Sequence, residues 1–239
     1  MQCADAQAGA ENWPSYDAAS GVPPIRENEI HLWRTPLDIA PDRIVTLENI
    51  LSPDERERAA RFRFPEHRAR FIAARGALRR ILGIHLGHNP QSLRFAYGEH
   101  GKPTLAEPAD TCIEFNISHS ADLAVYAISI GCRVGVDVEF IKPDGSWMKI
   151  AEHYFSPDES ARLSTLPEIG MRQAFFELWA EKEARMKALG VGLRFPLDKV
   201  DGSKEWLVIK FNPMKGYAAA LACESQGTPP VIVKHHFAT

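Results

Sequence analysis

The chain has 239 residues, 45% of them hydrophobic and 25% charged, which is the composition of a globular protein with room for one large domain or two small ones. Its formal net charge of −3 excludes the strongly basic balance expected of a protein that binds nucleic acid or an acidic membrane. An anionic ligand would therefore have to be held by a local group of charges.

The cysteines and the N-terminus bear on the cellular compartment. Cys3, Cys112, Cys132 and Cys223 lack the close spacing typical of zinc sites and of disulfide frameworks. The first 25 residues hold no lysine, no arginine and no long apolar run, so they lack the features of a secretory signal. No stretch reaches the roughly 18 consecutive apolar residues of a membrane helix. We expect a soluble, cytoplasmic protein without a membrane partner.

The chain begins with an irregular segment. Residues 1–28 are rich in Ala, Gly, Ser, Pro and Asn and show no amphipathic period, which predicts a loose extension or a strap over the surface. We assign this extension no chemistry. Residues 29–34 then alternate polar and apolar side chains, as a half-buried strand does.

A helix start occurs twice. Residues 52–55, Ser-Pro-Asp-Glu, place serine at an N-cap, proline at the first helical position and acids in the first turn, and residues 156–159 repeat them. The same offset of 104 pairs three more residues: Arg58 with Arg162, Arg68 with Arg172 and Phe71 with Phe175. A longer helix is expected after each start, over about 65–86 and 170–189, each ending near a glycine. Chance would account for two good N-caps alone, but the additional matches favour an internal duplication.

Strand-like segments follow each long helix. They cover 92–97, 113–117, 123–129 and 133–140, and then 206–211, 217–223 and 231–236. We therefore predict an α+β fold, a pseudo-twofold duplication of a unit whose helices pack on a small, mostly antiparallel sheet. The expected parts are the extension, an N-terminal unit over 29–131 and a C-terminal unit over 132–239, with the active site at the seam between the units.

Two acids alternate with valines in Gly135-Val136-Asp137-Val138-Glu139. On a strand this alternation sends Asp137 and Glu139 to one face, about 7 Å apart. Hard oxygen ligands without nearby His or Cys suit Mg²⁺, which binds one or two carboxylates together with phosphate oxygens and water. Taken alone, such a pair is more often simply solvated.

The second long helix carries charges beside an indole. Trp179, Glu183 and Lys187, with Lys182, fall in one broad stripe at helical spacing. One interpretation is an exposed Glu183–Lys187 pair over a buried tryptophan. The other makes Glu183 a third carboxylate for the ion or a catalytic base, and makes Lys182 and Lys187 ligands of a phosphate.

Two polar segments of the first half allow similar alternatives. Ser118 and His119 follow an apolar strand, either as a structural turn or as contacts to a phosphate. Lys102 lies between Gly101 and Pro103, where a turn with a solvated lysine is the default interpretation.

Taken together, the segments resemble the 4′-phosphopantetheinyl transferase superfamily, specifically its two-repeat, single-chain branch, which includes the enzymes that activate surfactin synthetase. The resemblance rests on the blocks EHGKPTL, FNISHS, GVDVE and FFELWAEKEARMKALGVGL, in this order, and on the earlier block SPDERERAARFRFPEHRARFIAARGALR. It runs from about Ile30 to at least Leu193. Each motif alone favours a structural or solvated role, but the joint presence of these blocks favours the functional interpretation of each.

The resemblance implies a metal site and a catalytic centre. Asp137, Glu139 and Glu183 match magnesium-binding acids, and Lys187 matches a lysine that contacts the pyrophosphate of coenzyme A and assists the leaving group. Glu159 matches an acid proposed as the base, and the choice between it and Glu183 stays open.

The resemblance also implies a binding site for coenzyme A. The residues that match phosphate or adenosine contacts are Lys102, Ser118 and His119, with Arg70 and Arg75 near the 3′-phosphate. Glu55 stands where some relatives carry a lysine.

The implied activity is transfer of the phosphopantetheine arm of coenzyme A to a serine of an apo carrier protein, acyl or peptidyl. The duplication predicts a monomer that contains both halves of its cleft. The alternatives are a protein that binds coenzyme A or a carrier protein without catalysis, and a metal-dependent phosphoesterase.

Overall fold

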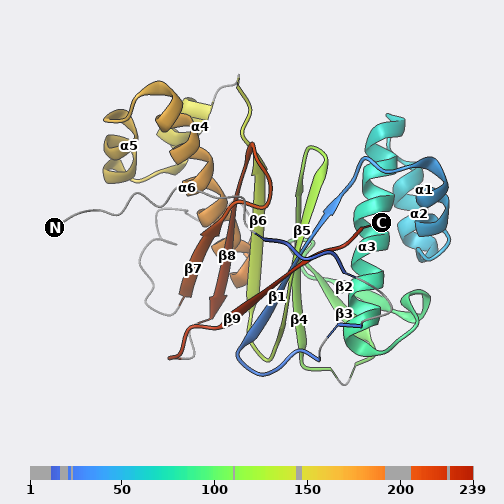
Figure 1. Cartoon of the computed structure of the whole chain (residues 1–239). Helices are drawn as coiled ribbons and strands as arrows, with labels where there is room; N and C mark the ends of the chain where they lie inside the picture. Colours follow the sequence, from blue (N-terminus) through green and yellow to red (C-terminus); the bar gives the residue numbers. More distant parts are fainter. Residues whose placement is uncertain are drawn as a thin grey trace.

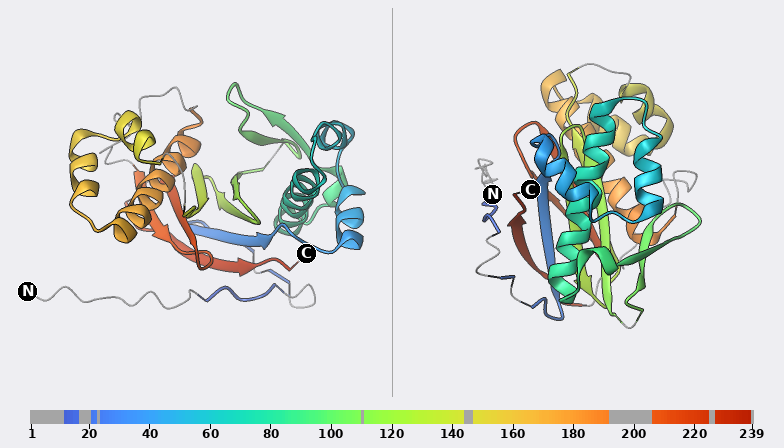
Figure 2. Two further views of the ribbon diagram at one scale, coloured as in Figure 1. Left: turned by 90° about the horizontal axis from the view of Figure 1, so that it is seen from above. Right: turned by 90° about the vertical axis from the view of Figure 1, so that its right-hand side faces the viewer.

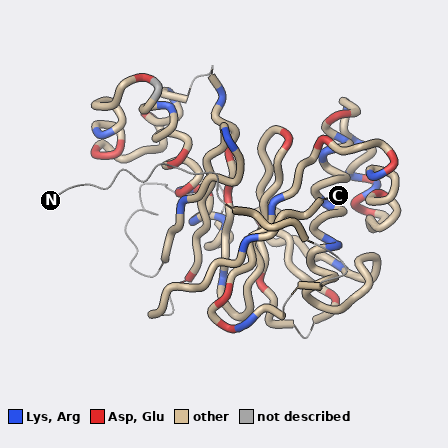
Figure 3. Tube along the Cα trace, in the orientation of Figure 1, with Lys and Arg blue, Asp and Glu red and all other residues tan. Residues whose placement is uncertain are grey.

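The structure of the chain is a computed structural model (Figure 1). It describes residues 12–16, 21–22, 24–109, 111–143, 147–191, 206–224 and 227–238. Most of the predicted extension lies outside the described residues, as do Cys3 and Leu193, the latter at the end of the last matching sequence block. Lysines, arginines and acids are interspersed along the described chain (Figure 3).

Both predicted helix pairs are present. The helices are α1 (Pro41–Glu48), α2 (Pro53–Ala60), α3 (Pro65–Leu86), α4 (Trp147–Tyr154), α5 (Pro157–Ser164) and α6 (Glu168–Leu189), with a 3₁₀ turn η1 (Pro90–Ser92). Both Ser-Pro-Asp-Glu starts form capping boxes, in which the serine and the glutamate three residues later bond each other's backbone. The sequence patterns did not identify α1 and α4. No described helix is both long and apolar enough to cross a membrane.

All predicted strands form, and the described residues contain one more. The strands are β1 (Glu29–Pro36), β2 (Arg94–Tyr97), β3 (Pro103–Glu107), β4 (Ile113–Ser120), β5 (Leu123–Ile130), β6 (Val134–Phe140), β7 (Trp206–Phe211), β8 (Tyr217–Glu224) and β9 (Val231–His236). Strand β3, which pairs with β2, was not predicted. The turn interpretation of Ser118 and His119 is wrong, because β4 continues through Ser120 and the chain turns only at Ala121 and Asp122.

Sheet topology confirms the α+β duplication. The first half forms an antiparallel sheet β4-β5-β1, and the second half forms an antiparallel sheet β7-β8-β6. In each of these three-stranded units, the central strand is the one that comes last in the sequence. The C-terminal strand β9 then returns to pair in parallel with β1, and so completes the sheet of the first half. Helices α3 and α6 stand on either side of the strands (Figure 2).

The two long helices correspond at an offset of 103, from 65 to 168 at their starts and from 86 to 189 at their ends, whereas α2 and α5 correspond at 104. The predicted pairs Arg68 with Arg172 and Phe71 with Phe175 are therefore one residue out of register. Gly87 and Gly190 end the helices with φ values of 65° and 74°, the left-handed conformation that glycine adopts without a Cβ penalty.

Close packing of α6 on the second sheet depends on small residues. Ala180, Ala184 and Ala188 of the helix are buried against alanines of β8. At Gly135 of β6 an added Cβ would lie 2.1 Å from the carbonyl oxygen of Ala184, so only glycine permits this approach. The backbones of α6 and β6 therefore approach each other closely at a point two residues before Asp137, the first acid of β6.

The alternation predicted for β6 is present. Val136 and Val138 pack with Leu32 of β1 and Val125 of β5 in a core beneath β6, which leaves the opposite face of the strand for its acids. A second core joins α1, α2 and α3 to the first sheet.

We predict that Gly135→Ala separates α6 from β6. The methyl group would overlap helix backbone, which cannot rotate away, so we expect a loss of about 3 kcal/mol in the free energy of unfolding. Chemical denaturation measures it. The matched control is Gly170→Ala near the start of α6, where the nearest atom to an added Cβ is 4.0 Å away. Equal stability of the two variants would contradict the close packing.

Three histidines gather where β9 joins the fold. Nδ1 of His31 lies 3.2 Å from Nε2 of His235, and Nε2 of His85 accepts a hydrogen bond of 3.2 Å from the indole of Trp33. Burial lowers the pKa of all three, to about 3 for His85 and about 4 for His235. The facing acid is Glu29, whose Oε2 lies 3.6 Å from Nε2 of His31.

We predict an acid-sensitive fold from this cluster. Because the folded pKa values lie below the ordinary value of 6.5, the unfolded chain takes up these protons first, and stability is lost as the pH falls from about 6.5 to 4. Each histidine contributes at most about 1.4 kcal/mol per pH unit to this slope. His85→Gln should flatten the slope in denaturation titrations, whereas His88→Gln, at an exposed position, should not. Equal slopes would contradict the assignment.

Candidate active site

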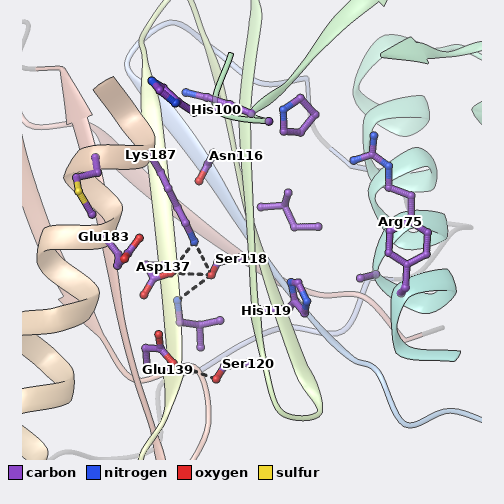
Figure 4. A pocket seen from close by; sticks show the side chains of 18 of the residues that line it. Arg75, His100, Asn116, Ser118, His119, Ser120, Asp137, Glu139, Glu183 and Lys187 are labelled. Carbon is purple, nitrogen blue, oxygen red and sulfur yellow. Dashed lines mark hydrogen bonds and ion pairs between the residues drawn. The ribbon is translucent and has the colours of Figure 1, made fainter. Parts of the chain in front are cut away.

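A cleft of about 1050 Å³ lies between the halves. Side chains of α2, α3 and the loop before β3 line one wall, and side chains of α6 line the other. Strands β4 and β6 lie between these walls (Figure 4). The cleft therefore takes side chains from both halves, at the seam where the duplication predicted a site.

The structure brings the three predicted acids together in this cleft. Asp137 and Glu139 project from β6 and Glu183 projects toward them from α6 (Figure 4). Because Gly135 lets the helix approach the strand, the two elements place their acids within the same space.

Asp137 is the best anchored of the three acids. Its side chain is almost fully buried, and its Oδ1 accepts hydrogen bonds of 2.8 Å from Oγ of Ser118 and 2.6 Å from Nζ of Lys187. Its Oδ2 is buried without a hydrogen-bond partner among the described residues. A buried carboxylate oxygen without a partner is costly, and a cation beside it would remove that cost.

The surroundings of the other two acids, Glu183 and Glu139, disfavour their ionised forms. Burial, and next the negative charge of Asp137, raise the pKa of Glu183 to about 7. The same two causes raise the pKa of Glu139, whose Oε2 accepts a hydrogen bond of 3.1 Å from Ser120. Adding a positive charge here would favour both ionised forms.

These residues fit a hard divalent cation by their chemistry. All three offer carboxylate oxygens, which suit Mg²⁺, and Val138 between the first two offers no ligand. Within the described ranges, no three acids, histidines or cysteines are gathered closely enough to hold an ion as they stand. The ammonium of Lys187 lies against Asp137 instead, so rotation of side chains would be needed to turn all three acids onto one ion.

The predicted phosphate contacts of the first half lie at the same cleft. Ser118, His119 and Lys102 all line it. The interpretation of Lys102 as a solvated turn residue is wrong, because its Nζ reaches across to donate to the carbonyl of Val134, 3.3 Å away, and burial lowers its pKa.

The two predicted arginines differ in their surroundings. Arg70 is partly exposed on the cleft wall, where its guanidinium forms two hydrogen bonds, of 2.7 and 2.8 Å, to the carboxylate of Asp38. Arg75 is buried, and donates to Glu55 and to Tyr97. Glu55, which stands where some relatives carry a lysine, is thus the acid that holds Arg75 in position.

Sequence reasoning missed several cationic or titratable residues of the cleft. They are Arg58, His67, His100 and Lys142. They come from four separate segments, and only the folded chain gathers them. For Arg58 alone a signal existed, since it belongs to the first of the duplicated helix starts.

Two predicted site residues lie elsewhere. Glu159 and Lys182 form an ion pair of 2.9 Å, are both buried, and are not among the residues that line the cleft. Oε2 of Glu159 caps its own helix by accepting from the backbone of Ser156.

The first half repeats this ion pair. Glu55 caps α2 in the same way and bonds Arg79, which occupies the position in α3 that Lys182 occupies in α6. The repetition favours a structural role for both pairs, as ties between the short and long helices of each half.

Comparison with known proteins agrees with this architecture. A family model described as the 4′-phosphopantetheinyl transferase superfamily matches residues 133–220. A second model, described as the N-terminal part of 4′-phosphopantetheinyl transferase, matches residues 40–130. Each model therefore covers one half of the duplicated fold.

Individual relatives extend over more of the chain. The 4′-phosphopantetheinyl transferase HetI of Nostoc sp. strain PCC 7120 is 37% identical over 218 residues, which cover 86% of this chain and 92% of the relative. The 4′-phosphopantetheinyl transferase Sfp of Bacillus subtilis strain 168 is 31% identical over 63% of this chain and 65% of its own length. The 4′-phosphopantetheinyl transferase psf-1 of Bacillus pumilus is 34% identical over 65% and 64%. On this similarity, and with both halves of the fold matched, the chain belongs to the 4′-phosphopantetheinyl transferase superfamily.

Proposed function

We propose that this protein transfers the 4′-phosphopantetheine arm of coenzyme A to a serine of a carrier protein, with Mg²⁺ bound by Asp137, Glu139 and Glu183. The observation that carries the proposal is the arrangement of the cleft. Three acids and Lys187 lie on β6 and α6, and arginines and histidines of the other half line the same cleft. A ligand with a pyrophosphate at one end and a further phosphate at the other suits this distribution of charge.

The reaction is a substitution at phosphorus. The serine oxygen of the carrier protein forms a bond to the β-phosphorus of coenzyme A, the bond from that phosphorus to the bridging oxygen breaks, and 3′,5′-ADP leaves. The serine proton passes to a carboxylate, for which we propose Glu183, because it lines the cleft and projects toward the other two acids. Glu159, tied to Lys182 outside the lining, is less suited.

We propose that Lys187 binds the pyrophosphate and assists the leaving group. Its ammonium lies beside Asp137, where it can donate to the pyrophosphate and stabilise the negative charge that develops on the 5′-phosphate of the departing 3′,5′-ADP. When bound, Mg²⁺ neutralises charge on the pyrophosphate and so reduces its repulsion of the incoming oxygen.

The remaining cationic residues would hold coenzyme A in place. Arg70, which lines the cleft as Arg58 does, is suited to the 3′-phosphate, because an arginine can form two parallel bonds to a phosphate. Lys102 and His119 are suited to the phosphates nearer the strands. Arg75 would act chiefly by supporting this wall, since its guanidinium is bonded to Glu55 and Tyr97.

Further parts of the proposal concern the cellular context. Because both halves of the cleft come from one chain, we propose that the enzyme acts as a monomer. We also propose that it works in the cytoplasm on acyl or peptidyl carrier proteins.

Intact-mass measurement tests the proposed function directly. The protein is incubated with coenzyme A, Mg²⁺ and a panel of apo carrier proteins. We expect one or more carriers to gain the mass of one phosphopantetheine arm, with release of 3′,5′-ADP. Unmodified carriers throughout would favour a non-catalytic binding protein, and release of phosphate or free phosphopantetheine without a carrier would favour a phosphoesterase.

We predict that Asp137→Asn reduces the transfer rate by at least about 10²-fold, because the variant loses one charge of the ion site while keeping the shape of the side chain. The same assay at matched Mg²⁺ measures it. Asp158→Asn, an identical change at an exposed position of α5, is the control and should retain full activity. Wild-type turnover by Asp137→Asn would refute the assignment of Asp137.

We predict that Arg70→Ala raises the KM for coenzyme A by about 10- to 100-fold, the value of a hydrogen bond to a charged group. The KM for 3′-dephospho-coenzyme A should stay near that of the wild type, since this substrate lacks the phosphate that Arg70 would bind. Arg61→Ala, an exposed change outside the cleft lining, should leave both values unchanged. An equal effect on both substrates would contradict the proposed contact.

A further inference from the structure

Strands β4 and β6 lie side by side at the seam, although they belong to different sheets. Each is the edge strand of its sheet at this place. An edge strand presents unpaired N–H groups, and buried N–H groups need partners. The side chains that bond these N–H groups of β6 also contact its two acids.

Side chains of β4 accept the hydrogen bonds that a neighbouring backbone would otherwise accept. Three alternate residues at the end of β4 each accept a hydrogen bond from an N–H group of β6, at a constant spacing of 20 residues. The three bonds run from Val136 N to Asn116 Oδ1 at 2.9 Å, from Val138 N to Ser118 Oγ at 3.3 Å and from Phe140 N to Ser120 Oγ at 3.1 Å. We call these three bonds the β4 ladder.

The two serines of the β4 ladder also bond the acids. Ser118 donates to Oδ1 of Asp137 at 2.8 Å, and Ser120 donates to Oε2 of Glu139 at 3.1 Å. Each serine therefore grips β6 twice, at the N–H group of one residue and at the carboxylate of the residue before it. Asn116 bonds only the N–H group of Val136, since the residue before it, Gly135, has no side chain to bond.

The hydrogen-bonding capacity of Ser118 is fully used in this arrangement. A hydroxyl offers one donor and two acceptor lone pairs. Ser118 donates to Asp137 and accepts from Val138 N and, at 2.8 Å, from Nζ of Lys187. Contact with a phosphate, which the resemblance implies for this residue, would require one of these bonds to break.

We infer that the β4 ladder positions the acids of β6: Ser118 and Ser120 each hold one carboxylate oxygen and, with Asn116, fix the backbone of β6 against β4. This inference rests on the proposed function, because the held acids are those proposed to bind Mg²⁺. The serines are positioning residues. They leave the second oxygen of Asp137 for the cation, because its Oδ2 is buried without a hydrogen-bond partner among the described residues. Outer-shell partners of metal-binding carboxylates commonly set their orientation in this way.

The test compares three variants of the full chain. Ser120→Ala removes one rung, Ser120→Thr keeps its hydroxyl, and Ser129→Ala removes a buried serine hydroxyl of β5 that bonds the carbonyl of Cys132 away from the cleft. Thermal unfolding first shows that all three are folded. The first readout is amide hydrogen exchange of Phe140 in metal-free protein, measured by NMR. We expect about tenfold faster exchange in Ser120→Ala and wild-type exchange in the other two.

The second readout is Mg²⁺ binding measured by calorimetry. We expect Ser120→Ala to weaken binding about 10- to 100-fold, with wild-type affinity in Ser120→Thr and Ser129→Ala. Unchanged exchange of Phe140, or unchanged Mg²⁺ affinity, in Ser120→Ala would overturn the inference while leaving the proposed function standing. Failure of the wild type itself to bind Mg²⁺ would overturn the proposed metal and the positioning role together.

Discussion

The contact of α6 with β6 at Gly135 is the constraint on which the cleft depends. A helix and a strand normally keep the distance that their side chains impose, but here an alanine face meets a glycine and the backbones nearly touch. That approach brings Glu183 and Lys187 of the helix over Asp137 of the strand. Burial, and next the negative charge of Asp137, raise the pKa of Glu183 and of Glu139, and the charge of Lys187 offsets part of this effect. Packing of small apolar residues thus produces an electrostatic site.

The two halves share the arrangement of their helices and strands, but they contribute different side chains to the cleft. Both keep the capping glutamate tied to the same position of the long helix, through Arg79 in one and Lys182 in the other. The positions of Glu183 and Lys187, by contrast, hold Arg80 and Ile84 in the first half. One half therefore contributes mainly acids and the other mainly bases to a shared cleft. A ligand that carries several phosphates can bridge them, with a cation at the acidic side.

The sequence predicted the helices and strands well because their starts, ends and buried faces are marked by residues close together in the chain. Capping boxes, terminal glycines and alternating apolar residues located both long helices and most strands. The acids of β6 and α6 were found for the same reason. Long-range pairing was not visible: nothing in Glu159 marks it as the partner of Lys182, and nothing in His67, His100 or Lys142 marks a shared cleft. The role of the β4 serines also depends on a strand twenty residues later in the chain.

The central claim is that acids of β6 and α6 jointly bind one divalent cation. The most direct measurement is a crystal structure of the full chain grown with coenzyme A and Mn²⁺, in which the anomalous signal locates the metal without assumptions about the ligands. The account predicts one strong peak within bonding distance of Asp137, Glu139 and Glu183 and of a pyrophosphate oxygen. A peak elsewhere in the cleft, with these carboxylates pointing apart, would contradict it.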